Sequence, residues 1–278
     1  MSKDLKPLFI FINEKGGVGK TLLAKAFAEY ANTTNLCCAK FDLDPATRSF
    51  ARAYGKAGED IDPISGVVLA SPDHQESIFD FIGQLARRWE ECDYAVADFG
   101  AGVYDRWVSG ELFQETNAFV STLEEYGWRI CFVIVITPDQ ASSETPKKLY
   151  MGFGKSPKYA MVQNEYFGKI YDGSSKSCSE FPYFDPPTWC RTNIQQEARE
   201  CIRDQMEKKG AQTFVFRSLR CNSVRLELDT SRATISDLYL AKSLDVATKM
   251  TLTPWLIGVW QLIDSIFKFV GAAAKESK

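Results

Sequence analysis

The chain has 278 residues, 45% of them hydrophobic, so it can bury one sizeable core, and α/β domains of this length are usually undivided. Its net charge of −3 argues against a polyanion-binding protein that works by bulk electrostatics. Eight cysteines without a CxxC pair, and His74 as the only histidine, argue against a zinc site and favour a reducing cytosol.

The most informative segment is residues 14–21, EKGGVGKT, which follows the apolar run 8–12 and precedes a helical pattern, LLAKAFAEYA. This strand–loop–helix order is the context of a phosphate-binding loop, in which backbone N–H groups and a helix N-terminus hold an anion. A glycine-rich turn without a ligand is the alternative, which the agreement of all these features disfavours. The predicted nucleotide-binding residues are Gly16, Gly17, Val18, Gly19, Lys20, Thr21 and Leu22.

Within this loop, Lys20 can reach the β- and γ-phosphates, and the Thr21 hydroxyl can ligate Mg²⁺. Glu14 stands where the pattern GxxxxGK[ST] has its first glycine, and Lys15 adds a second lysine. This departure resembles the deviant Walker A motif of the ParA/MinD ATPases, which are SIMIBI-class P-loop NTPases. The resemblance implies bound ATP or ADP with Mg²⁺ and an ATP-dependent homodimer, in which Lys15 crosses the interface to the partner's nucleotide.

A second buried strand is predicted over residues 36–43, and two carboxylates, Asp42 and Asp44, leave its end on the same face. The ParA/MinD family carries DxDP here. The resemblance implies that Asp44 orients or activates the attacking water and that Asp42 serves as a switch or in the metal shell. The alternative is an Asp-Pro turn without a catalytic role.

An amphipathic helix is predicted over residues 78–90, followed by a strand in the segment 93–102, DYAVADFGAG. An acidic residue at the end of an apolar strand, followed by small residues, is typical of a Walker B aspartate. Asp98 is therefore predicted to lie in the Mg²⁺ shell, and Gly100 to act as a switch whose backbone N–H contacts the γ-phosphate.

The nearly continuous apolar run 130–139 predicts a central parallel strand, followed by a crossover helix and, in the segment 159–168, a further strand that ends in Asn164. Asn164 lies where the family places an asparagine that reads adenine. An asparagine that caps its own turn is the alternative. We expect an α/β fold with a doubly wound, mostly parallel sheet and helices on both faces. A single domain would span 1–278, with a surface insertion near 171–191 and a helical extension at 234–274.

Charge is unevenly distributed: residues 1–190 carry 19 Lys/Arg and 26 Asp/Glu, whereas residues 191–278 carry 14 and 10. ParA-type proteins bind DNA nonspecifically through basic residues in this part of the chain. The candidates for DNA contact are Arg217, Arg220 and Arg225, with Arg232 nearby. The favoured alternative is that these arginines pair with acidic neighbours such as Glu227, Asp229 and Asp237.

The segment 253–273 predicts a largely apolar helix with a narrow polar stripe of Gln261, Asp264 and Lys268. Its internal charges make it a poor membrane span. It could pack on the domain, form a protein interface, or lie in a membrane interface. The first two are favoured because the broad basic face of interfacial helices is missing.

We therefore expect a slow, partner-stimulated ATPase of the ParA type that positions or partitions cargo in the bacterial cytoplasm, with nucleoid or membrane association left open. We expect no signal peptide, because the first predicted strand begins close to the N-terminus. The chain resembles ParA-like proteins of conjugative plasmids, of the TraL/StbB type, in the segments DYAVADFGAG and VQNEYFG and in the helix between them. This resemblance implies a role in plasmid maintenance or transfer.

Two other classes remain open. One is a nucleotide-gated scaffold with negligible hydrolysis. The other is a metabolic or redox enzyme on the same scaffold, for which Cys92 and Cys131 flank the Asp98 segment. No cysteine follows Asp98, where an iron–sulfur protein of this type carries one.

Overall fold

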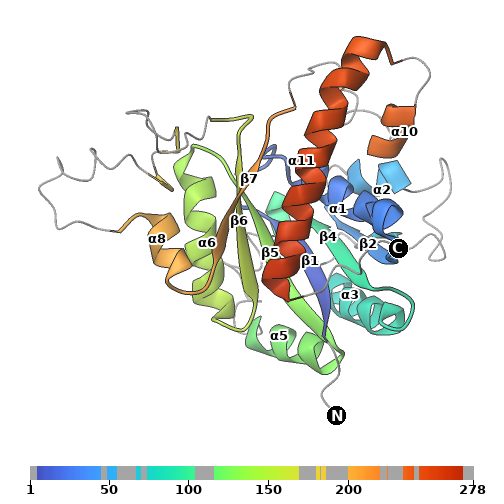
Figure 1. The fold of residues 1–278 in the computed structure, drawn as a ribbon. Coiled ribbons are helices and arrows are strands. Elements are labelled where there is room, and N and C mark those ends of the chain that lie inside the picture. The colour runs from blue at the N-terminus through green and yellow to red at the C-terminus, as the bar shows by residue number, and fades with distance from the viewer. Residues whose placement is uncertain are drawn as a thin grey trace, which may run out of the picture.

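In the computed structural model, seven strands of the described part of the chain form one sheet in the order β3-β2-β4-β1-β5-β6-β7 (Figure 1). Every neighbouring pair is parallel. The strands are β1 (Lys6–Ile12), β2 (Cys38–Leu43), β3 (Val67–Leu69), β4 (Tyr94–Phe99), β5 (Trp128–Ile136), β6 (Lys158–Asn164) and β7 (Gln212–Phe216). The structure describes residues 5–44, 49–54, 67–69, 74–103, 116–168, 180–181, 183–185, 200–219, 224, 234–240 and 244–271.

Helices cover both faces of the sheet. The described helices are α1 (Lys20–Thr34), α2 (Ser49–Tyr54), α3 (His74–Arg88), α5 (Thr116–Glu125), α6 (Gln140–Phe153), α8 (Ile202–Glu207), α10 (Ile235–Leu240) and α11 (Val246–Val270). Apolar residues of α1, α2, α10 and α11 pack in one core, and those of α3, α5, α6 and α8 pack in the other. The predicted doubly wound α/β fold is confirmed.

Strand β1 shows why two cores form. Phe9 and Phe11 belong to one core, whereas Leu8, Ile10 and Ile12 belong to the other. Because successive side chains of a strand point to opposite faces, a strand with helices on both sides must be apolar at every position. The uninterrupted run that predicted β1 is therefore a direct consequence of its central place in the sheet.

Helix α11 packs on the sheet beside α1 (Figure 1). The ring of Phe267 lies 4.8 Å from that of Phe9 and 5.1 Å from that of Tyr94, measured between centroids. Asp264, one of the predicted polar-stripe residues, accepts a hydrogen bond from the Tyr30 hydroxyl of α1. Of the three arrangements considered for this segment, packing on the domain is therefore observed. Among the helices that the structure describes, none is long and apolar enough to cross a membrane.

Several predicted boundaries were wrong, and a side-chain contact explains one of them. Strand β5 ends at Ile136 instead of reaching Asp139, because Asp139 caps the N-terminus of α6. The predicted end of strand β6 at Asn164 is confirmed, and the Asn164 side chain turns the chain there by accepting a hydrogen bond from the Tyr166 N–H. The short strand β3 was not predicted. Most of the proposed insertion at 171–191 lies outside the described residues.

Replacing Phe267 by Ala is expected to lower the free energy of unfolding by about 3–5 kcal/mol, because it leaves a cavity between α11 and the sheet. Chemical denaturation followed by circular dichroism measures the change. Ile257→Ala is the matched control on the same helix: this side chain is 52% exposed, and we expect a loss below about 1 kcal/mol. Similar losses in the two variants would contradict the packing of α11 described above.

Candidate functional site

The phosphate-binding loop predicted from the sequence joins β1 to α1 at the carboxyl-terminal edge of the sheet. Since the strands are parallel, the ends of β2, β4, β5 and β6 meet at this same edge. The chain leaves β1 between β4 and β5, near the centre of the sheet. In open α/β sheets, ligands bind in such a crevice outside the carboxyl ends of the strands.

The loop has the backbone geometry of an anion-binding turn. Gly17 and Gly19 have φ angles of 72° and 100°, which side chains rarely allow. Gly19 stands at the N-cap of α1, which has no side-chain cap, whereas α6 and α11 both begin with a capping aspartate. The N-terminus of α1 is therefore left without a side-chain acceptor, as a site for an external anion requires.

Lys20 lies inside the loop and is only 7% exposed. Its Nζ donates hydrogen bonds to the carbonyl of Lys15 at 2.8 Å and to that of Asn13 at 3.5 Å. Burial lowers the pKa of Lys20, while the charges of Asp98 and Asp44 oppose this shift. The loop carbonyls therefore orient the Lys20 ammonium group close to the N-terminus of α1.

Thr21 and Asp98 form the part of the site that fits a magnesium ion. The Thr21 hydroxyl donates to Asp98 Oδ2 at 2.6 Å. The other oxygen, Asp98 Oδ1, is buried without a hydrogen-bond partner in the described part of the chain. Burial, followed by the charge of Asp42, raises the pKa of Asp98 to about 7. A hydroxyl and an unsatisfied buried carboxylate are the oxygen groups that Mg²⁺ uses together with nucleotide phosphates.

Asp42 and Asp44 follow the end of β2 with different surroundings. The Asp42 carboxylate accepts the backbone N–H groups of Asp44 at 2.9 Å and of Ala51 at 2.7 Å, so it shapes the turn that carries Asp44. Asp44 in turn lies against Gly100: a Cβ atom on that glycine would come within 2.7 Å of Asp44 Oδ1. The two segments predicted to be switches are therefore in direct contact.

Asn164 binds the phosphate loop itself. Its Nδ2 donates to the Val18 carbonyl at 2.9 Å, and a Cβ on Gly19 would come within 2.7 Å of the same nitrogen. Its Oδ1 accepts the Tyr166 N–H at 3.1 Å, so the turn-capping alternative is observed. Because both polar groups have protein partners, the adenine contact stays a prediction that needs a direct test.

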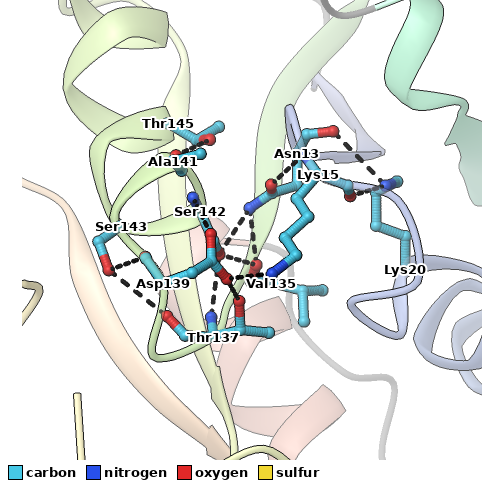
Figure 2. A network of polar contacts seen from close by, with 10 residues as sticks. All are labelled: Asn13, Lys15, Lys20, Val135, Thr137, Asp139, Ala141, Ser142, Ser143 and Thr145. Atoms are coloured by element: carbon cyan, nitrogen blue, oxygen red, sulfur yellow. Dashed lines mark hydrogen bonds and ion pairs between the residues drawn. The ribbon is translucent and has the colours of Figure 1, made fainter.

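A polar network next to the loop was missed by the sequence analysis (Figure 2). Asn13 donates from Nδ2 to the Val135 carbonyl at 2.8 Å and to Ser142 Oγ at 3.1 Å, and it accepts the Lys15 N–H at 2.7 Å. The Lys15 ammonium lies 3.1 Å from Asp139 Oδ2. An aspartate just before a helical pattern is an N-cap signal, which could have indicated Asp139 but not its contact with Lys15.

On the same loop, Glu14 forms a 2.5 Å ion pair with Lys148 of α6. The residue that breaks the standard glycine pattern therefore attaches the loop to α6.

The remaining candidates lie apart from this network. Arg217 is exposed and pairs with Glu165 at 2.6 Å, whereas Glu227 and Asp229, two of the acidic residues predicted as partners, lie outside the described residues. Arg220, Arg225 and Arg232 lie outside the described residues. Cys92 and Cys131, considered for an iron–sulfur centre, are buried near the amino-terminal ends of β4 and β5, away from the loop.

Residues 9–271 match the protein family described as the CobQ/CobB/MinD/ParA nucleotide binding domain. No curated protein matches. Among solved structures, the chain resembles one in the MinC:MinD cell division protein complex of Aquifex aeolicus, with a TM-score of 0.52 and 12% identity over 95% of this chain and 96% of that one. It also resembles pnob8 ParA, with a TM-score of 0.50 and 12% identity over 96% and 98%. At such identities the likeness shows the fold alone.

Replacing Asn164 by Asp keeps the acceptor for Tyr166 but removes the donor to the Val18 carbonyl. If Asn164 acts by holding the loop, affinities for ADP and GDP should fall together, each by about tenfold. Titration calorimetry with both nucleotides measures this. A loss confined to ADP would instead assign the side chain to the adenine base.

Replacing Asp98 by Asn should stabilise the protein at pH 8 without nucleotide or magnesium, by about 1–2 kcal/mol, because it removes a buried charge beside Asp42. The amide oxygen can still accept the Thr21 hydroxyl. With ADP and magnesium added, only the wild type should gain further stability. Thermal denaturation in both conditions is the measurement, and a variant that is less stable than the wild type without ligand would contradict the prediction.

Proposed function

Because the chain belongs to the family of CobQ/CobB/MinD/ParA nucleotide-binding domains, we propose that it is an ATP-dependent, dimerising ATPase of the ParA type. Its role is to position or partition cargo, in plasmid maintenance or conjugative transfer. Turnover is slow and stimulated by a protein partner. Cargo control of this kind uses the ATP/ADP cycle to switch association on and off, so fast turnover would defeat it.

One observation carries the proposal: the loop holds two lysines in opposite environments. Lys20 is buried in the loop, whereas the Lys15 side chain is 51% exposed. A buried lysine can neutralise the phosphates bound to its own subunit. An exposed lysine on the outer side of the same loop can reach the phosphates bound to another. This second, exposed cation on the loop is what a dimer with shared phosphate contacts would require.

The proposed roles of the residues follow from their places in the site. Gly16, Gly17 and Gly19 turn amide groups toward the phosphates, and Lys20 neutralises them. Thr21 and Asp98 would hold a magnesium ion, which would supply positive charge to offset the charge that develops on the phosphates. Asp44 positions water for in-line attack on the γ-phosphate.

Release after hydrolysis follows from the contact between the two switch segments. Gly100 lies against Asp44, so a change at the γ-phosphate that moves one strand end must move the other. We propose that this paired movement opens the dimer. Nonspecific DNA is a second possible ligand through Arg217, Arg220 and Arg225, whereas a membrane surface is less favoured. The protein acts in the bacterial cytoplasm.

The test is size-exclusion chromatography of Asp44→Ala, which should bind ATP without hydrolysing it. We expect a dimer with ATP and magnesium and a monomer with ADP, and the wild type should give a dimer that decays as phosphate is released. Repeating the run with nonspecific DNA tests the arginine candidates. A monomer under every condition, with ATP shown to be bound, would refute the dimer switch.

Two further variants serve as controls. Lys20→Ala should lose nucleotide binding altogether, whereas Lys15→Ala should bind ATP normally and yet remain monomeric. A Lys15→Ala protein that dimerises like the parent would remove the cross-subunit role. Phosphate release at a rate indistinguishable from zero, with and without DNA, would favour a nucleotide-gated scaffold over an ATPase.

A further inference from the structure

In the nucleotide-free chain, the exposed lysine of the phosphate loop already has a counterion. Lys15 Nζ lies 3.1 Å from Asp139 Oδ2, between the loop and the start of α6 (Figure 2). Asp139 is fixed in place, since its Oδ1 accepts the Ser142 N–H at 2.9 Å and its Oδ2 accepts the Thr137 hydroxyl. The carboxylate is therefore a rigid partner for a long and otherwise flexible side chain.

The surroundings keep Asp139 charged. Partial burial alone would raise the pKa of its carboxyl, but hydrogen bonds from Thr137, Ser142 and Lys15 outweigh burial and hold the pKa below its usual value. Asn13 connects the backbone of Lys15 to the Val135 carbonyl and to Ser142, so the loop and the end of β5 cannot move independently. The ion pair joins two elements that are already tied together.

We propose that Asp139 is a positioning residue that holds Lys15 on its own subunit and thereby sets the ATP concentration at which the dimer forms. This inference rests on the proposed function. In this proposal Lys15 leaves Asp139 to reach a partner's phosphate, so dimerisation breaks the ion pair in each subunit. The cost of breaking the pair is the same with ADP and with ATP, and the additional phosphate charge of ATP offsets more of this cost.

The change in the dimer association constant that is expected from losing the ion pair can be bounded. Partly exposed ion pairs shift an equilibrium by about twofold to fivefold. Since a dimer breaks two such pairs, removing them should raise the association constant of the ATP-bound dimer by about fourfold to 25-fold. The difference should shrink as salt is added, because salt screens the competing attraction.

Asp139→Asn is the appropriate variant. Asparagine caps helices as well as aspartate does, so the Ser142 contact and the start of α6 are kept while the charge is lost. Glu144→Gln is the matched control: it removes the same charge from the same helix, and its side chain contacts Gln140 at 2.8 Å rather than the loop. A general effect of charge on α6 would appear in both variants.

Two measurements test the proposal. The first uses nucleotide-free monomer: brief labelling with an amine-reactive reagent, followed by peptide mass spectrometry, should show Lys15 reacting at least twofold faster in Asp139→Asn than in the wild type or Glu144→Gln. The second is sedimentation velocity over a range of protein concentrations with a non-hydrolysable ATP analogue and magnesium. It should show tighter dimers for Asp139→Asn only.

Three outcomes overturn the proposal: unchanged Lys15 labelling, equal dimer affinities in all proteins, or weaker dimers in Asp139→Asn. The last would mean that Asp139 supports the dimer instead of opposing it. A wild type that stays monomeric with the analogue bound is a failure of the proposed function, and the labelling result would then still decide whether Asp139 holds Lys15.

Discussion

The parallel pairing of the seven described strands is the constraint on which the site depends. It places the carboxyl ends of β1, β2, β4, β5 and β6 along one edge, so residues from distant parts of the sequence face a single loop. The register is specific: Asp42 of β2 is paired with Asp98 of β4, which brings the two carboxylates side by side. A sheet with antiparallel neighbours would separate these side chains by the length of a strand.

Because charged groups meet at this edge, the site contains groups that are energetically unfavourable in the free protein. One buried carboxylate oxygen of Asp98 has no hydrogen-bond partner among the described residues, and the pKa of the Asp98 carboxyl is raised. Helix α1 begins without a side-chain cap. Each feature is unfavourable in the free protein, and each would be relieved by a bound magnesium ion or phosphate. The aromatic packing of α1, β1 and α11 stabilises the fold and offsets the cost of these groups. The stabilising contacts therefore lie in the core, and the unfavourable groups lie at the edge of the sheet.

Local sequence patterns predicted much of this arrangement, because hydrophobic spacing and glycine positions reflect the conformation of short segments. Sequence patterns predicted strand β1 from its apolar run, the loop from its glycines, and the role of Asp98 from its place near the end of an apolar strand. The observed strand order agrees with the predicted doubly wound fold. Errors arose at element ends, where side chains decide the boundary. Strand β5 ends before Asp139 because this residue caps α6 through a hydrogen bond, which a hydrophobic pattern does not reveal. The three-residue strand β3 is too short to carry a pattern.

By itself, the sequence determined that a phosphate-binding loop follows the first strand, since glycine conformations and helix termini are properties of a short segment. Only the tertiary structure decided what surrounds the loop. The contacts of Lys15 with Asp139, of Glu14 with Lys148 and of Asn164 with Val18 join residues more than a hundred positions apart. Such pairs depend on which strands become neighbours, and that choice is made by the packing of the whole chain.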